Sequence, residues 1–255
     1  MNIKIITDSV CDLPVELAQE HDIEVVPVYI NIDGQSYLDG IDLSRHEFYS
    51  RLPQTTSPTT TAAPGPGAFA AAYEKAAGKG ADVILSIHVA ESLSTTINAA
   101  RAAVDMFSKI PVWVVDSGQL SLGLGIQALT AARAALSGQP IDAILKSLDD
   151  LRRRTYVYAV VDTLEYLRRS GRVERYKAKL GAMVRLKPIL KFHNSQIAME
   201  MAVTTSRAIR RMREIAAGHA PLQHLSFIHS LASKSVADLQ QLMAGFKPVK
   251  EPSLV

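Results

Sequence analysis

Two Asp-Ser pairs are the first residues here whose types and positions suggest chemistry. Asp8 precedes Ser9 and Asp116 precedes Ser117, and each pair follows a short run of β-branched residues. Because open α/β sheets place ligands beyond the carboxyl ends of their strands, both pairs are predicted to lie at such an edge. Carboxylates at that edge can coordinate magnesium, or they can anchor loops by accepting hydrogen bonds from backbone N–H groups. The sequence leaves both interpretations open.

A second candidate site is the stretch QTTSPTTTAAPGPG at residues 54–67, which contains no charged residue. Its prolines and glycines predict a loop, and its threonine hydroxyls are neutral hydrogen-bond donors. Asp12 and Pro14, in contrast, are typical of the N-cap and the first turn of a helix.

Several catalytic and cofactor motifs are absent from the sequence. GPGAFA at 65–70 has the glycine spacing of a dinucleotide site, but it follows a loop instead of a strand, and Pro66 lacks the N–H that a pyrophosphate needs. The chain has no GxxxxGK[ST] loop, no G-x-S-x-G serine and no HExxH pair among its seven histidines. We therefore predict neither a metal site nor a cofactor.

Composition limits the class of protein further. A chain of 255 residues with 47% hydrophobic content can bury one large α/β core or two small ones, and a net charge of +3 is too mild to indicate nucleic-acid binding. The basic runs LRRR and RRMRE are expected on solvated helix faces. A single cysteine, Cys11, and an N-terminus that leads directly into the strand-like IKIIT predict a cytoplasmic protein. Residues 118–136 are too polar for membrane insertion and are expected to form a buried helix.

Residues 1–154 are predicted to form an α/β domain with a mostly parallel sheet flanked by helices. Runs of β-branched residues alternate there with helical patterns, which is typical of such a sheet. The expected strands are IKIIT, EVVPVYI, DVILSIHV and PVWVVD, and the expected helices cover 67–78, 94–108, 121–137 and about 141–154.

Residues 155–255 are predicted to form a second, smaller mixed α+β domain. TYVYAVV, PILKF and IAMEMAV read as strands, with a turn at HNSQ, and LSFIHS reads as a further strand. Helices are expected at 205–217 and 233–244.

Three longer stretches together resemble the DegV family of bacterial fatty-acid-binding proteins. They are ITDSVCDLP (6–14), VVDSGQLSLGLG (114–125) and VVDTLEYLRRSGRVERYKAKLGAMVRLKPIL (160–190), supported by LSTT (93–96) and PGPGAF (64–69). The resemblance covers nearly the whole chain, and the long central stretch is its most specific part.

The resemblance implies two α/β domains with an acyl chain buried between them. It implies that the protein is not an enzyme but a carrier of a long-chain fatty acid such as palmitate. The carrier would present the carboxylate to a separate fatty acid kinase, whose acyl phosphate feeds phospholipid synthesis. The family's threonine in its Thr-Ser-x-Pro loop falls on Thr61, and its serine in Leu-Ser-Gly-Thr falls on Ser94. Both are expected to bind the head group, with Ser94 at the start of a helix whose N–H groups and positive dipole end attract the same anion.

The resemblance is incomplete at two places. Family members usually finish with a strand and a His-x-Gly-Pro-Gly segment, which the sequence ending in KPVKEPSLV does not contain, so a last strand is expected to be missing. A family Val-Arg-Thr stretch is replaced by Val203, Thr204 and Thr205. Arg172 in SGRV does match a recurrent family arginine, and it could dock the kinase or cap the preceding helix.

Two other functions remain as alternatives. One is a metal-assisted hydrolase or phosphotransferase that uses Asp8 and Asp116. The other is a regulatory module that senses lipid.

Overall fold

The computed structural model describes residues 1–162, 166 and 186–246. The chain divides into two compact units, Met1–Val157 with Phe192–Gln196, and Tyr158–Lys191 with Ile197–Val255. Among the described residues, no helix is both long enough and apolar enough to cross a bilayer.

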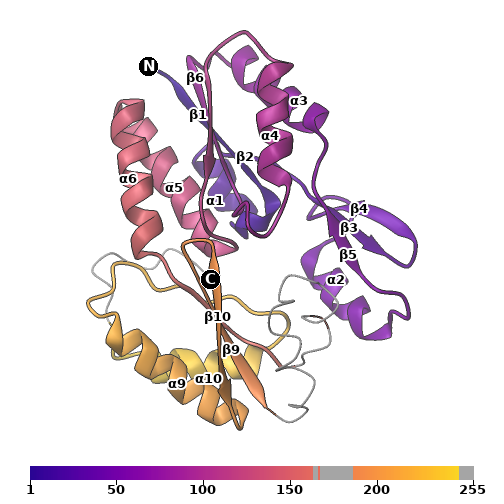
Figure 1. The fold of residues 1–255 in the computed structure, drawn as a ribbon, viewed down its shortest axis with the longest axis vertical. Coiled ribbons are helices and arrows are strands. Elements are labelled where there is room, and N and C mark those ends of the chain that lie inside the picture. Colours follow the sequence, from indigo (N-terminus) through magenta and orange to yellow (C-terminus); the bar gives the residue numbers. More distant parts are fainter. Residues whose placement is uncertain (163–165, 167–185, 247–255) are drawn as a thin grey trace. The chain divides into compact units, whose positions relative to one another are not determined.

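The first unit contains a four-stranded sheet whose order is β2-β1-β6-β7 (Figure 1). All its neighbouring strands are parallel, and Ile6 of β1 lies beside Ser86 of β6. The strands are β1 (Ile3–Asp8), β2 (Glu24–Val26), β6 (Val83–His88) and β7 (Val112–Asp116). The predicted parallel sheet is therefore confirmed.

Helices cover both faces of this sheet. α5 (Leu122–Leu136) and α6 (Ile141–Arg154) bury the face that carries Ile5 and Leu85, together with α1 (Val15–Glu20). α3 (Pro66–Gly78) and α4 (Thr96–Asp105) bury the face that carries Ile6 and Ile84. Each strand therefore has apolar side chains on both faces, as expected of a parallel sheet between two helical layers.

One glycine explains how closely α5 approaches the sheet. A Cβ on Gly125 would lie 2.5 Å from the carbonyl oxygen of Cys11 and 3.0 Å from Leu13. Only glycine therefore lets α5 pack against η1 (Ser9–Cys11), the short 3-10 helix that follows β1.

The first unit also contains a small antiparallel sheet of order β4-β3-β5, which the sequence did not predict. Its strands are β3 (Tyr29–Ile32), β4 (Gln35–Leu38) and β5 (Thr60–Ala62). Between β4 and β5 the chain forms α2 (Arg45–Arg51) and the short 3-10 helix η2 (Leu52–Gln54). EVVPVYI was expected to be one strand, and this is wrong. The run divides at Pro27 into β2 and β3, which belong to different sheets.

The second unit contains a three-stranded sheet of order β10-β9-β8 and two helices. Its elements are β8 (Val157–Val160), β9 (Lys187–His193), β10 (Gln196–Ala202), α9 (Thr205–Gly218) and α10 (Ser233–Met243). Ile189, Ala202 and Ala208 are buried in its core. This confirms the smaller unit that combines a sheet with helices, the turn at HNSQ and both helices. The strand expected at LSFIHS is wrong, because residues 225–230 have no regular secondary structure and belong to none of the sheets that the described residues form.

Candidate functional site

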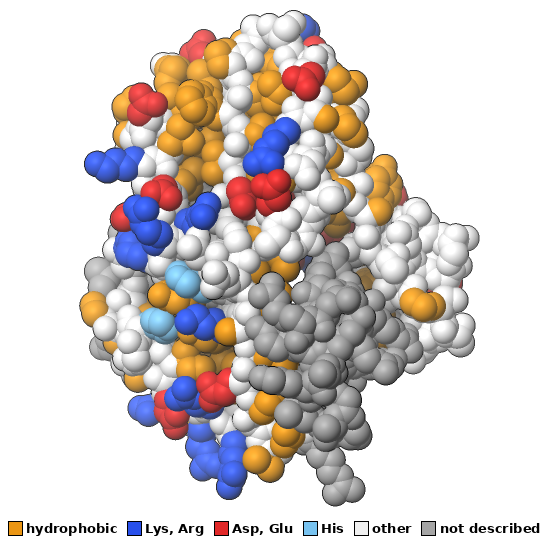
Figure 2. All heavy atoms as spheres, in the orientation of Figure 1, with side chains coloured by type: hydrophobic (Ala, Val, Ile, Leu, Met, Phe, Trp, Pro, Cys, Tyr) orange, Lys and Arg blue, Asp and Glu red, His pale blue; other side chains and the backbone are white. Residues whose placement is uncertain are grey.

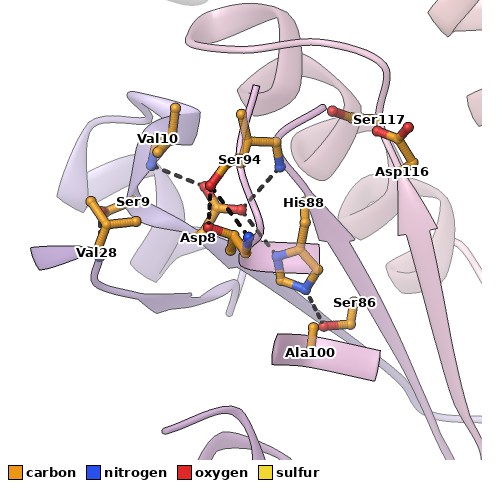
Figure 3. Close-up of polar contacts among 12 residues, drawn as sticks. Asp8, Ser9, Val10, Val28, Ser86, His88, Ser94, Ala100, Asp116 and Ser117 are labelled. Carbon is orange, nitrogen blue, oxygen red and sulfur yellow. Dashed lines mark hydrogen bonds and ion pairs between the residues drawn. The ribbon is translucent and has the colours of Figure 1, made fainter. Parts of the chain in front are cut away.

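Asp8 ends β1 with a buried carboxylate that accepts three hydrogen bonds (Figure 3). Its Oδ1 accepts from the backbone N–H of Val10 at 3.1 Å. Its Oδ2 accepts from the N–H of Val89 and from Nδ1 of His88, both at 3.0 Å. Asp8 and His88 are both fully buried. The carboxylate is therefore satisfied by the protein and holds the ends of β1 and β6 together.

A chain of buried polar groups continues from His88. Its Nε2 lies 2.7 Å from the hydroxyl oxygen of Ser86, and the Tyr73 hydroxyl lies 3.1 Å from the same oxygen and 3.3 Å from the carbonyl of Ala100. Because residues two apart on a strand share a face, Ser86 and His88 both point toward α3 and α4. Burial raises the pKa of Tyr73 to about 12, although its hydrogen bond with Ser86 acts in the opposite direction. The phenol is therefore a neutral member of this chain at physiological pH.

The order of Ser86, His88 and Asp8 is that of a Ser-His-Asp catalytic triad. With Nδ1–H donating to Asp8, the Nε2 of a neutral ring accepts the Ser86 proton, as a general base would. All three side chains are fully buried, however, and Ser86 already bonds to Tyr73. Since no substrate atom can reach the hydroxyl, the arrangement fixes the positions of strands and helices.

Asp116 anchors a loop in the second Asp-Ser pair. Its Oδ1 accepts from the N–H of Gly118 at 2.8 Å and of Glu91 at 3.3 Å, which joins the loops after β7 and β6. The anchoring interpretation therefore fits both aspartates, and Asp8 has no oxygen available for magnesium. Within the described ranges, no three His, Cys, Asp or Glu side chains are grouped to hold a metal ion.

Ser94 lies two residues before the helix that it was expected to begin. The helix predicted at 94–108 is α4, which covers Thr96–Asp105 and has Thr95 as its N-cap. The Ser94 hydroxyl oxygen accepts from the N–H of Thr96 at 3.3 Å and lies 2.8 Å from the Thr96 hydroxyl. Ser94 is half-buried, and its hydroxyl holds the first turn of α4 through these contacts with Thr96.

Thr61 lies in β5, so the expectation of a continuous loop at 54–67 is wrong at residues 60–62. Thr61 pairs with Ile30 of β3, and its side chain is exposed. Antiparallel pairing with β3 satisfies the backbone of this charge-free stretch, which explains why a strand forms there. In the described part of the chain, the hydrogen bonds given for the Ser94 side chain are both to Thr96.

Asp12 is not the helix cap that its sequence position indicated. α1 begins at Val15 after Pro14, without a side-chain cap. Asp12 has a positive φ of 53°. Its Oδ1 contacts the Arg45 guanidinium, and its Oδ2 accepts a hydrogen bond from the Ser121 hydroxyl at 2.6 Å. Burial raises the pKa of Asp12, and the Arg45 guanidinium acts in the opposite direction. Asp12 therefore ties η1 to α2 and to the start of α5.

The basic runs lie on helix surfaces with acidic neighbours. In α6, Arg153 pairs with Asp149 at 2.7 Å and Arg154 with Asp150 at 3.0 Å. In α9, Arg211 pairs with Glu200 at 2.6 Å and with Glu214 at 2.9 Å. Figure 2 shows basic and acidic side chains mixed over one face of the described residues. This agrees with the predicted solvated helix faces.

Arg172, the other predicted site residue, lies outside the described residues.

Sequence reasoning assigned no role to His88, Ser86 and Tyr73. A signal was present in VILSIHV, because Ser86 and His88 are polar residues at alternate positions of an otherwise apolar strand. Two polar residues on one face of a buried strand indicate a hydrogen-bonded network beneath the covering helices. Their partner Tyr73 could not be found in this way, since it comes from a different element.

The sequence matches over residues 2–255 the model of a family described as "Uncharacterised protein, DegV family". It is 34% identical to Protein DegV of Bacillus subtilis over 218 residues, which are 84% of this chain and 77% of that protein.

Two solved structures are similar over almost the whole chain. One, described as showing fatty acid binding of a DegV family protein from Thermus thermophilus, is 31% identical with a TM-score of 0.89 and covers 99% of this chain and 91% of its own. The other, DegV from Bacillus subtilis described as a fatty acid binding protein, is 31% identical with a TM-score of 0.86, over 96% and 89%. Both are described as binding proteins and not as enzymes.

Proposed function

Since this chain belongs to the DegV family, we propose that it binds a long-chain fatty acid and carries it without converting it. The observation that supports this most strongly is the pair of fatty-acid-binding relatives at 31% identity, which match the fold over at least 96% of the chain. The buried Asp8–His88 pair supports it as well, since it leaves no accessible nucleophile or metal site where a hydrolase would need one.

Thr61 and Ser94 bind the carboxylate in this proposal. Ser94 accepts a hydrogen bond from Thr96 N–H, which leaves its own proton able to turn toward a ligand oxygen. The first turn of α4 adds N–H groups and the positive end of the helix dipole next to Ser94. Thr61 is exposed on β5 and offers a second neutral hydroxyl.

Neutral donors suit a carrier that must release its ligand or hand it on. A bidentate arginine would hold the carboxylate more strongly and would also cover its oxygens. The acyl chain can supply the affinity, since about 15 buried methylenes at roughly 0.8 kcal/mol each contribute on the order of 12 kcal/mol before ordering costs. In this proposal the tail provides affinity and the hydroxyls provide orientation.

Lipid extraction tests the proposal directly. Purified protein is denatured, and the released lipids are identified and quantified by mass spectrometry. We expect about one long-chain fatty acid per chain. A preparation that takes up no fatty acid, even after incubation with an excess, would contradict the proposed function.

Paired variants test the two hydroxyls. Thr61→Val and Ser94→Ala should each lower fatty acid affinity about tenfold, because loss of one donor to a carboxylate costs about 1.5 to 3 kcal/mol. Thr60→Val is the matched control, since Thr60 is an exposed neighbour on the opposite face of β5 and accepts from Asn31. Equal affinity of the Thr61→Val and Ser94→Ala double variant and the parent would remove these residues from the site.

The proposal extends to a partner, a separate fatty acid kinase that phosphorylates the presented carboxylate. Arg172 lies in the basic segment RRSGRVER and is proposed to dock that kinase. Arg172→Ala should then bind fatty acid normally but be phosphorylated more slowly, and the defect should grow with salt concentration. Parent-like phosphorylation rates at every salt concentration would exclude the docking role.

A further inference from the structure

The turn between β9 and β10 is held by the two loops that follow β6 and β7. Asn194 and Ser195 have positive φ angles of 47° and 63°, as a two-residue hairpin turn requires. The N–H of Ser195 donates to the carbonyl of Gly118 at 3.0 Å, and its carbonyl accepts from the Ser92 hydroxyl at 2.9 Å. The backbone of one turn residue therefore bonds to both loops. All these residues belong to the first unit.

Side chains hold the same turn from α6 and from the start of β8. Nε of Arg152 donates to Oδ1 of Asn194 at 2.8 Å. The His193 ring stacks on Tyr156 with centroids 4.0 Å apart, and its Nδ1 donates to the carbonyl of Thr155 at 2.9 Å. Contacts from four separate segments thus fix the position of a turn that contains only two residues.

Gly118 makes this close approach possible. Its φ is +58°, and a Cβ there would lie 2.9 Å from Nε of Arg152 and 3.2 Å from the hydroxyl oxygen of Ser195. Any other residue would push Arg152 and the turn away. The loop after β7 is therefore shaped to receive the turn.

The loop that contains Ser92 also contains Ser94. At its beginning, Val89 N–H donates to Asp8 and Ala90 N–H donates to the carbonyl of Gln119, at 3.0 and 2.8 Å. Beyond Ala90, the N–H of Glu91 donates to Asp116, and the N–H groups of Leu93 and Ser94 donate to the carbonyl of Ala90. The hydroxyl of Ser92 adds a bond to the hairpin turn, two residues before Ser94. Because Ser92 is exposed, water can replace this bond, whereas the bond from Val89 to Asp8 is buried.

We propose that the Asn194–Ser195 turn is a positioning device for the loop at 89–95, and that it holds Ser94 in place so that a bound carboxylate is retained. Ser92 and Asn194 are the positioning residues whose side chains make the contacts. This inference rests on the proposed function. The turn contributes to how long the ligand stays, because opening of the Ser92 bond removes the contact between the turn and the part of the loop that carries the head-group hydroxyl.

Side-chain deletions on each side of the turn provide the test. Ser92→Ala removes the bond to Ser195, and Asn194→Gly removes the bond to Arg152 while permitting the positive φ. Release of a fluorescent long-chain fatty acid, measured by stopped flow, should be about fivefold faster in each single variant, which equals about 1 kcal/mol. Release should be faster still in the double variant, with association rate and melting temperature close to those of the parent. Ser92→Thr keeps the hydroxyl and should release the fatty acid at the parent rate.

The control is Ser50→Ala, which removes an exposed hydroxyl that donates to His46 within α2. A second readout needs no ligand: hydrogen exchange of the ligand-free protein should be faster in a peptide spanning 89–96 and unchanged in one spanning 3–8.

Each outcome decides the proposal. Parent-like release and parent-like exchange in the double variant would overturn the positioning role. Faster exchange with parent-like release would overturn the retention role. Failure of the parent itself to bind fatty acid would overturn the proposed function together with retention, and the exchange result would then show separately whether the turn positions the loop.

Discussion

The first unit has two polar regions that differ in access to solvent. The chain Asp8, His88, Ser86 and Tyr73 is fully buried, and its groups bond to one another. The hydroxyls of Thr61 and Ser92 are exposed, and that of Ser94 is half-buried. The buried region contains the groups that a catalytic site would use, and the accessible region contains only weak neutral donors.

This difference shows why residue types alone do not identify a functional site. A carboxylate, an imidazole and a hydroxyl in triad order can serve as a structural network when packing excludes substrate. Exposed hydroxyls are weak neutral donors, yet a ligand can reach them and accept their protons. The comparison predicts large stability effects in the buried region and small ones in the accessible region.

Asp8→Asn gives the largest expected effect. An amide in place of the carboxylate turns its NH₂ group toward an N–H donor in a fully buried site, either that of Val10 or those of Val89 and His88. We expect a loss of about 2 to 4 kcal/mol in the free energy of unfolding, measured by urea denaturation.

Asp116→Asn is the matched control, because it also follows a strand and precedes a serine. One oxygen of Asp116 accepts both of its hydrogen bonds, so an asparagine can keep them. The expected loss is below about 1 kcal/mol. Equal losses in the two variants would contradict the distinction between a fully buried carboxylate and a half-buried one.

Tyr73→Phe should have an intermediate effect. The substitution removes the hydroxyl that contacts Ser86 and Ala100 but keeps the ring packed between Phe69 and Phe107. We expect a loss of about 1 kcal/mol in unfolding free energy and unchanged fatty acid affinity. Tyr37→Phe, which removes a hydroxyl bonded to Gln35 at the surface, should cost clearly less. A large fall in affinity for Tyr73→Phe alone would place the buried chain in the binding site.

Asp12→Asn changes a half-buried carboxylate outside both regions. It has the smallest expected effect on the free energy of unfolding. Burial raises the folded pKa of Asp12 above its ordinary value of 3.8. The folded protein therefore binds this proton more readily than the unfolded chain, so Asp12 adds stability as pH falls from neutral toward 4 and loses that contribution as pH rises through the folded pKa. The variant lacks this change.

Denaturation curves of the parent and Asp12→Asn at several pH values between 4 and 7 measure the difference. The parent should gain stability relative to the variant on acidification. The opposite sign would mean that attraction to Arg45 outweighs burial.

Most elements of the fold could be predicted from sequence, because the periods of apolar residues differ between strands and helices. The strands at Ile3–Asp8 and Val83–His88 and the helices at Leu122–Leu136 and Thr205–Gly218 lie within a few residues of their predicted positions. The predictions failed for short segments such as Thr60–Ala62 and LSFIHS. Whether such a segment is a strand depends on a neighbour with which its backbone can pair, and that neighbour is distant in sequence.

The sequence by itself determined the parallel sheet, the absence of familiar nucleotide and metal-binding motifs and the family. These follow from local patterns and from motifs in a fixed order. The tertiary structure alone decided that Asp8 meets His88, 80 residues away, and that Asp12 pairs with Arg45 and not with a helix end. It alone placed the Asn194–Ser195 turn against Ser92 and Gly118. The physical reason is that burial and hydrogen-bond partners depend on which elements pack together, and a local pattern specifies the elements but not their neighbours.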